Sequence, residues 1–148
     1  MESWHPETIR GILYKVCGQL AKRKSDKIVF GYFEALQVFL ASIDCVHFRW
    51  EECRTDPGGH WYSHKHNGPG VSYEVCVDTV KDRNVWTNGP FAAATHDITI
   101  FCGGKKNVSE DKWSKSSLFH QIPEGCRVVG DSGYVGEPEK VSTTLSGH

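Results

Sequence analysis

An alternating run of apolar residues in the middle of the chain limits the fold more than any other feature. Every second position of "VSYEVCVDTV" (residues 71–80) is apolar: Val71, Tyr73, Val75 and Val77. Alternate side chains of a strand point to the same face, so these four predict one face of a β-strand. "KDRN" then suits a tight turn and "VWTN" a returning strand, which Gly89 and Pro90 are expected to end. The sequence therefore predicts a β-hairpin over residues 71–87.

Two further strands are predicted on either side of this hairpin. "LASIDCVHFRW" (residues 40–50) is rich in β-branched and aromatic residues, and "CRVVGD" (126–131) is a short apolar run after a turn. Residues 51–70 hold two clusters of Pro and Gly and are expected to be mostly loop, as is the tail 135–148. A last strand that is reached through a helical crossover can lie parallel to the first.

Three helices are predicted from spacing and capping. Apolar residues recur at helical intervals over residues 7–21: Ile9, Ile12, Leu13, Val16 and Leu20. A second helix covers "THDITIFCGG", with Thr95 as its N-cap and Gly103 near its end, and a third covers residues 109–122. Together with the strands they predict a mixed α/β domain, which follows an N-terminal helical segment and basic connector over residues 1–30.

Composition narrows the class of protein. The 148 residues suffice for one domain with its own core, and a formal net charge of −1 excludes a strongly basic nucleic-acid binder. The longest apolar region, residues 28–43, holds Glu34 and Gln37, so no membrane span is expected. The first residues lack the pattern of a secretion signal, and the six cysteines include no CxxC pair. These observations favour an intracellular protein with reduced thiols.

Two aspartates stand out because apolar strand residues precede them. Asp44 lies inside "SIDCVHF", and Asp131 follows "CRVVG". Aspartate is rarely buried unless it is paired or binds a metal, and neighbouring first and last strands would bring these carboxylates together. Hard oxygen ligands suit Mg²⁺ or Mn²⁺, and two such ions are known machinery for phosphodiester cleavage. The alternative for Asp131 is an ordinary turn, because Asp, Ser and Gly favour turns.

Five segments in register resemble one enzyme family. "SIDCVHFRWEEC", "WYSHKHNGPGVSYEVCVD", "VWTNGP", "THDITIF" and "VVGDSGYVGEP" follow the order of the DDE-superfamily endonuclease domain of PIF/Harbinger-like transposases, over about residues 40–140. The resemblance implies an RNase H-like fold in residues 31–148. In that fold the first three strands are antiparallel and a later strand is parallel to the first.

The resemblance also implies a site and its partners. It assigns catalytic and metal-binding roles to Asp44 and Asp131, and supporting roles to Gly133 and Tyr134 of the family's Asp-x-Gly-Tyr motif. It implies Mg²⁺ or Mn²⁺ as cofactor, transposon-end DNA as substrate, a separate DNA-binding partner protein and a location in the nucleus. The chain departs from many members where Cys45 follows the first aspartate, because they have glycine there.

The family completes its site with a glutamate on a helix several tens of residues beyond the Asp-x-Gly-Tyr motif. Glu137 and Glu139 are too close to Asp131 to match it. Asp44 and Asp131 therefore match two of the three metal ligands that the resemblance implies. The RNase H-like domain is expected to be incomplete at its C-terminal side. A missing last helix predicts an uncovered apolar face and self-association.

Other residues are candidates for supporting roles. Asp97 in "THD" matches an aspartate of the family and is a candidate metal contact, with His96 beside it; the alternative is an acid favoured by a helix N-terminus. His47 is expected to orient the first carboxylate or to pack in the core. An aromatic and basic loop offers candidate DNA contacts: Trp61, Tyr62, His64 and Lys65. The alternative is a surface loop whose long side chains lie along the protein.

Three functions stay open from the sequence. The first is a DDE-type nuclease that cleaves or transfers DNA strands and is impaired without its third acid. The second is a catalytically inactive, domesticated or relic domain that binds DNA or a protein. The third is a small zinc-binding module, for which the sequence offers a loose set of ligands: Cys45, His47, Cys53, His60, His64 and His66.

Overall fold

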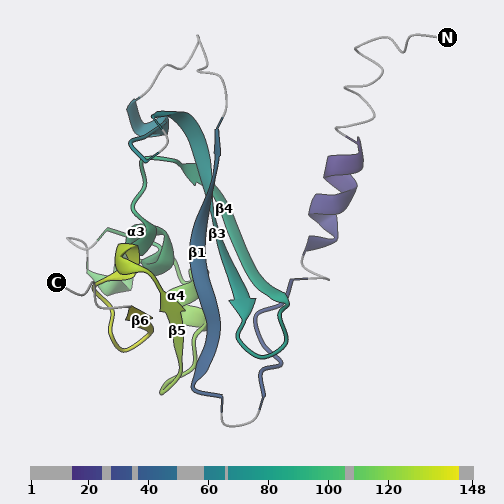
Figure 1. Cartoon of the computed structure of the whole chain (residues 1–148), viewed down its shortest axis with the longest axis vertical. Coiled ribbons are helices and arrows are strands. Elements are labelled where there is room, and N and C mark those ends of the chain that lie inside the picture. Colours follow the sequence, from purple (N-terminus) through teal and green to yellow (C-terminus); the bar gives the residue numbers. More distant parts are fainter. Residues whose placement is uncertain are drawn as a thin grey trace.

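The computed structural model describes residues 15–24, 28–34, 37–49, 59–65, 67–105 and 109–143. It has an α/β fold in which a curled, mixed sheet is accompanied by short helices (Figure 1). The strands are β1 (Phe39–Arg49), β2 (Tyr62–Ser63), β3 (Gly68–Asp78), β4 (Asn84–Ala92), β5 (Arg127–Gly130) and β6 (Val141–Thr143). Besides the helical residues 15–22, the helices are α3 (Asp97–Cys102) and α4 (Leu118–Gln121). The 3-10 turns are η1 (Gly59–Trp61), η2 (Glu110–Lys112) and η3 (Ser132–Tyr134).

β3 and β4 form the antiparallel hairpin that the alternating pattern predicts. The expectation that Gly89 and Pro90 end the second strand is wrong, because β4 continues to Ala92. Proline has no backbone N–H to donate to a ladder. β4 pairs with β3 alone among the described strands, so its outer side needs no ladder hydrogen bonds.

β1 joins the two halves of the sheet. It pairs antiparallel with β3 and parallel with β5, where Ser42 lies opposite Val129, so the predicted parallel pairing is confirmed. β6 pairs parallel with β5, and the expectation that the tail is all loop is therefore wrong for Val141–Thr143. A strand of three residues is too short to show a periodic pattern. Residues 144–148 lie outside the described part of the chain.

α3 confirms the second predicted helix with one correction at its start. The N-cap position is His96 rather than Thr95. The backbone N–H of Thr95 donates to the carbonyl of Ala92 at 2.9 Å, which holds Thr95 in the turn that follows β4. Gly103 ends the helix as expected, with a left-handed φ of 72°.

Residues 109–122 do not form the single helix that the sequence predicts. η2 and α4 are separate, and Trp113 between them has an extended backbone and a buried side chain. Ser117 is also buried, and its hydroxyl donates to the carbonyl of Cys102 at the end of α3 at 3.0 Å. Contacts with α3 thus override the helical tendency of the segment.

The N-terminal helix is described only in part. Residues 15–22 are helical, and all side chains of residues 15–24 are exposed. Residues 7–14, the rest of the predicted helix, lie outside the described residues. Among the residues that the structure describes, no helix is long and apolar enough to cross a membrane.

One face of the sheet is covered and the other is open. α3 and α4 lie against the covered face (Figure 1), where Ile43 and Cys45 join the core with residues such as Phe101. β3 turns its small and polar residues toward this face, and the buried ones include Ser72, Glu74, Cys76 and Asp78. The other side of β1 and β3 is called the open face here. Its apolar residues are Val46, Phe48, Val71, Tyr73, Val75 and Val77.

Candidate functional site: an acidic cluster beside β1 and β5

Asp44 and Asp131 occupy the same level on neighbouring strands. Two residues beyond the parallel pair of Ser42 and Val129, each segment presents one of the two aspartates. Asp44 lies within β1 and Asp131 is the N-cap residue of η3, directly after β5. Both residues are exposed.

Backbone amides orient both carboxylates. Oδ1 of Asp44 accepts a hydrogen bond from the N–H of Cys45 at 2.7 Å. Oδ1 of Asp131 accepts one from the N–H of Gly133 at 2.8 Å, which caps η3. The second bond is the Asx-turn chemistry that the alternative interpretation of "DSGY" expects. The turn at Asp131 therefore also fixes the position of its carboxylate, so the two interpretations of this segment are compatible.

Asp97, the first residue of α3, is the third carboxylate at this place. A Cβ atom at Gly133 would lie 2.7 Å from Oδ2 of Asp97 and 3.0 Å from Oδ1 of Asp131, so both carboxylates lie close to this glycine. Burial first, and then the charges of Asp131 and Asp44, raise the pKa of Asp97 above its ordinary value, against an opposing hydrogen bond with Cys45. Three carboxylates from separate elements thus share one neighbourhood.

A buried contact links the two segments that carry the aspartates. Sγ of Cys45, which follows Asp44, lies 3.2 Å from the hydroxyl oxygen of Tyr134, which lies three residues after Asp131. Burial raises the pKa of Cys45 to about 12 and that of Tyr134 well above its ordinary value. Both groups therefore stay neutral near pH 7. They act as a fixed spacer between the two segments rather than as an acid or a base.

The two histidines that the sequence analysis named lie in different settings. His47 is half-buried on β1, and its charge lowers the pKa of Asp97, which places it close to that carboxylate. His96 is exposed at the N-cap position of α3, where its side chain makes no capping hydrogen bond. Asp44, Asp97 and Asp131 are called the acidic cluster here. His47 therefore lies beside the acidic cluster, and His96 only flanks it.

The donor chemistry of the acidic cluster suits a hard divalent cation. Carboxylate oxygens are the ligands that Mg²⁺ and Mn²⁺ prefer, and a cation would relieve the repulsion that, after burial, raises the pKa of Asp97. In the described ranges, however, no three His, Cys, Asp or Glu side chains are arranged to hold a metal ion together. Asp44 and Asp131 therefore fit two ligands of such a site, with Asp97 beside them, and the described residues do not complete the set.

The candidate DNA contacts form a separate surface at the far end of the β1–β3 ladder. In chain order they are Trp61, Tyr62, His64 and Lys65, from η1, β2 and the following turn. Trp61 is half-buried and the other three are exposed, with the rings of Tyr62 and His64 edge to face at 5.4 Å. β2 pairs with the start of β3 near Arg49, which is about 17 Å from Asp44 at 3.4 Å per strand residue.

The described part of the chain contains no group of His, Cys, Asp or Glu side chains that could hold a zinc ion. Three of its six predicted ligands are not described: Cys53, His66 and the side chain of His60. Of the others, Cys45 is committed to the contact with Tyr134 and His47 lies near Asp97, whereas His64 belongs to the distant loop.

A buried carboxyl on β3 was not predicted from the sequence. Glu74 is fully buried opposite Cys45, and its Oε2 accepts a 2.7 Å hydrogen bond from the indole N–H of Trp86. Its Oε1 has no hydrogen-bond partner among the described residues. Burial is the main cause that raises the pKa of Glu74 to about 7. A glutamate between apolar neighbours was the available signal, but that pattern normally marks the solvent side of a strand.

Comparison with models of protein families, with curated proteins and with solved structures finds no match for this chain. The case for a function therefore depends on the acidic cluster and on the sequence motifs that surround it.

Proposed function

We propose that this chain is a transposase-derived nuclease domain of the DDE superfamily, with an RNase H-like fold, and that its acidic cluster acts on DNA phosphodiesters. The observation that carries the proposal is the convergence of Asp44, Asp131 and Asp97 from elements far apart in the sequence. The strand arrangement supports it, because β1 pairs antiparallel with β3 and parallel with β5.

The proposal gives each residue of the cluster a role. Asp44 and Asp131 would hold Mg²⁺ or Mn²⁺, which when bound polarises a phosphodiester and activates water or a 3′-hydroxyl. The N–H groups of Cys45 and Gly133 fix one oxygen of each carboxylate, so both are oriented before any ligand arrives. Asp97 adds a third negative charge beside them.

A second candidate function is a catalytically inactive domain that binds DNA or a protein. The observation that favours it is that the described residues contain no complete three-ligand metal group. Residues of a catalytic set act as a unit, so an incomplete set loses most of its rate. In this case the exposed Tyr62, His64 and Lys65 would contact a DNA strand by stacking and charge. The nuclear location and the separate DNA-binding partner stay predictions.

Two measurements on the full chain test the proposal and separate it from the alternative. The first is Mn²⁺ binding, followed by electron paramagnetic resonance, and the second is nicking of supercoiled plasmid in Mg²⁺ or Mn²⁺. We expect Asp44→Asn and Asp131→Asn to weaken Mn²⁺ binding and to lower the nicking rate at least about a thousandfold. Asp82→Asn is the matched control, because Asp82 is exposed in the hairpin turn with a φ of 47°, which asparagine tolerates.

The outcomes differ for the two functions. Mn²⁺ binding that depends on both aspartates, without nicking, would favour the inactive DNA-binding or protein-binding domain. Nicking that persists unchanged in Asp131→Asn, or a chain that neither binds Mn²⁺ nor cuts DNA, would contradict the proposed nuclease.

A further inference from the structure

A polar pocket lies beside α3 and has no part in the acidic cluster. Its volume is about 350 Å³, within the range of about 300–1,000 Å³ that is typical of small-molecule sites. The lining comes from β4, from α3 and from the segment that connects α3 to α4. None of the described lining residues is acidic. Several carry amide, hydroxyl or ammonium groups, among them Asn88, Thr99, Lys105, Ser114 and Ser116.

The carbonyl groups at the end of α3, which borders the pocket, already have donors. The last carbonyls of a helix normally lack a partner and carry partial negative charge. Here the carbonyl of Thr99 accepts from the N–H of Gly104 at 3.1 Å, and that of Ile100 accepts from the N–H of Gly103 at 3.1 Å. The carbonyl of Gly103 accepts in turn from the N–H of Ser114 at 3.1 Å. This end of the helix therefore repels an anion less than an unpaired helix end does.

Hydroxyl groups provide hydrogen-bond donors in the pocket. The Oγ atoms of Ser114 and Ser116 lie 2.9 Å apart, and both side chains are exposed. Each hydroxyl has one hydrogen, so when one serine donates to the other, the second keeps its own hydrogen for another group. Thr99, half-buried on α3, adds a further hydroxyl to the same pocket. Serine and threonine hydroxyls are common partners of phosphate oxygens.

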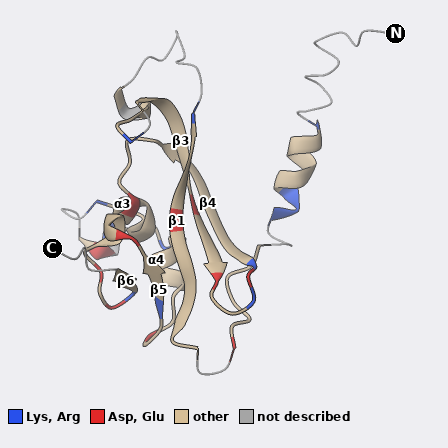
Figure 2. Ribbon diagram, viewed as in Figure 1, with Lys and Arg blue, Asp and Glu red and all other residues tan. Residues whose placement is uncertain are grey.

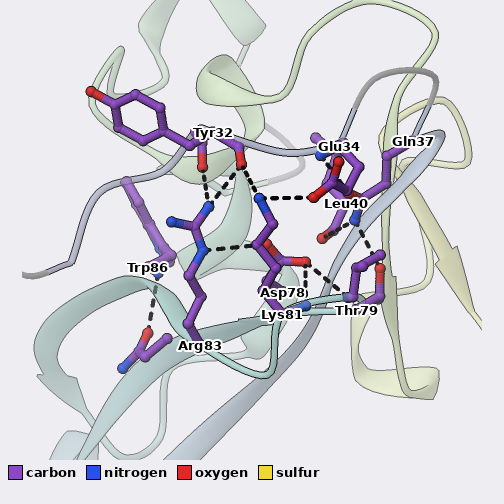
Figure 3. Close-up of polar contacts among 12 residues, drawn as sticks. Tyr32, Glu34, Gln37, Leu40, Asp78, Thr79, Lys81, Arg83 and Trp86 are labelled. Atoms are coloured by element: carbon purple, nitrogen blue, oxygen red, sulfur yellow. Dashed lines mark hydrogen bonds and ion pairs between the residues drawn. The ribbon is translucent and has the colours of Figure 1, made fainter.

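Lys105 supplies a positive charge that is not neutralised by the described residues. The basic side chains at the hairpin end of the sheet are engaged: Lys81 pairs with Glu34 at 2.9 Å, and Arg83 donates to backbone carbonyls at 2.7 and 3.0 Å (Figure 3). Within the described residues Lys105 is contacted only at its carbonyl, which accepts from the indole N–H of Trp113 at 3.4 Å. Its exposed ammonium group is therefore available to an anion in the pocket.

The segment that lines the pocket is basic, although the whole chain has a formal net charge of −1. Residues 103–117 contain four lysines against two acidic residues, Glu110 and Asp111. The described lysines of this segment are the blue positions between α3 and α4 in Figure 2. Local positive charge of this kind raises the concentration of anions near the pocket.

The pocket and the acidic cluster lie on different sides of α3. Asp97 and Thr99 are two residues apart on this helix, and each residue turns the helix by about 100°, so their side chains point to nearly opposite sides. With its side chains a helix is about 10 Å across. A phosphate in the pocket is thus separated from the carboxylates that would repel it. It is still within reach of a DNA strand at the cluster, because the phosphates of one strand follow each other every 3.4 Å or so along the duplex.

We propose that this pocket binds a phosphate group, whose charge Lys105 neutralises and whose oxygens accept hydrogen bonds from the hydroxyls of Thr99 and Ser116. A group of this chemistry comes either from the backbone of a DNA strand or from a small phosphate ligand. The pocket is a binding site beyond the acidic cluster. Its ligand needs no divalent cation, so the proposal stands or falls separately from the proposed nuclease.

Two probes, used with the full chain in EDTA, test this site and separate its two sources. One is inorganic phosphate, followed by its phosphorus NMR linewidth, and the other is a labelled single-stranded oligonucleotide, followed by fluorescence anisotropy. We expect Lys105→Gln to weaken the binding of each probe that the wild type holds at least about tenfold, because it removes a charge-assisted hydrogen bond. Thr99→Val keeps the shape of the side chain and should weaken binding about fivefold, as expected for one neutral hydrogen bond. For the oligonucleotide, Lys105→Gln should also reduce the salt dependence of binding by about one phosphate contact.

Lys112→Gln is the matched control, because Lys112 is exposed in the same segment, has the same charge and is not among the described residues that line the pocket. It should weaken binding less than about twofold, and circular dichroism should show all three variants folded. Binding of the oligonucleotide alone identifies a DNA strand as the source, and binding of inorganic phosphate identifies a small ligand. A wild-type chain that binds neither probe would overturn the proposal. Binding that Lys105→Gln leaves unchanged, or that Lys112→Gln weakens equally, would overturn it as well, because general charge attraction would then explain the data.

Discussion

At the scale of single residues, Glu74 is a carboxyl side chain that β3 turns into the core. Its carboxyl is fully buried, and its one hydrogen bond comes from the indole of Trp86. Burial, partly opposed by that bond, raises the pKa of Glu74 from 4.5 to about 7. The folded state therefore binds more protons than the unfolded state between these two values. Stability must fall as the pH rises through this window and must stay lower above it.

We predict that Glu74→Gln removes a large part of this pH dependence. The contribution of Glu74 is about 3 kcal/mol between pH 4.5 and 7, so the variant should be more stable than the wild type at pH 8 and similar at pH 4.5. Glutamine keeps an acceptor for the indole of Trp86. Urea unfolding at both pH values measures the effect, with Glu124→Gln as an exposed control. Equal pH dependence in Glu74→Gln and the wild type would show that the carboxyl is not buried as described.

Residue patterns predicted the acidic pair better than its surroundings. Asp44 and Asp131 were visible because each interrupts or ends an apolar strand, and each lies two residues beyond the parallel pair of Ser42 and Val129. Their proximity to Asp97 was not visible, because it depends on how α3 packs against η3, where Gly133 leaves room for two carboxylates. Burial of Glu74 was hidden because alternation reports which residues share a face and not which face is covered.

At the scale of elements, the turn after α3 depends on one glycine. Gly103 has a φ of 72°, and a Cβ atom there would lie 2.7 Å from Cβ of Ser117 and 2.9 Å from Cβ of Ser114. Gly125 has a similar φ of 76°, but a Cβ atom there would meet nothing within 4 Å. The two positions therefore share the backbone strain of a left-handed residue and differ in crowding.

We predict that Gly103→Ala destabilises the fold more than Gly125→Ala does. The shared strain should cost about 1–2 kcal/mol, and crowding at Ser114 and Ser117 should add about 1–3 kcal/mol at Gly103 only. Chemical unfolding of both variants measures the difference directly. Equal losses of stability would mean that the segment carrying Ser114 and Ser117 moves away from α3 without cost.

Elements with strong local signals were predicted, and those set by tertiary contacts were not. The hairpin, β1, β5 and α3 follow from alternation, composition and capping, and each is present. The predicted helix over 109–122 is split because Trp113 and Ser117 are committed to contacts with neighbouring elements. β6 was missed because three residues carry no period, and only pairing with β5 makes them a strand.

At the scale of the whole molecule, the core and the candidate site share the same elements. The covered face of the sheet holds the core, which includes Cys45 of β1. Asp44 beside Cys45, Asp131 directly after β5 and Asp97 of α3 form the acidic cluster. Gathering like charges works against folding, so a site of this kind reduces stability unless a ligand compensates for it. The overall stability of the chain should therefore report on the state of the acidic cluster.

Asp97 couples the acidic cluster to the stability of the fold, because its pKa is raised by burial and by its two acidic neighbours, Asp131 and Asp44. A carboxyl with a raised pKa destabilises the fold once the pH is above its folded-state value. In EDTA at pH 7.5 we therefore expect Asp97→Asn to melt at a higher temperature than the wild type, by about 2–4 °C for each kcal/mol of repulsion removed. Added Mn²⁺ should raise the melting temperature of the wild type more than that of the variant, because a ligand of the folded state stabilises it in proportion to its affinity. Calorimetry with Asp82→Asn as control checks both parts. A variant that melts below the wild type in EDTA would mean that the hydrogen bond between Asp97 and Cys45 outweighs the repulsion, and the cluster would then be a structural network rather than a cation site.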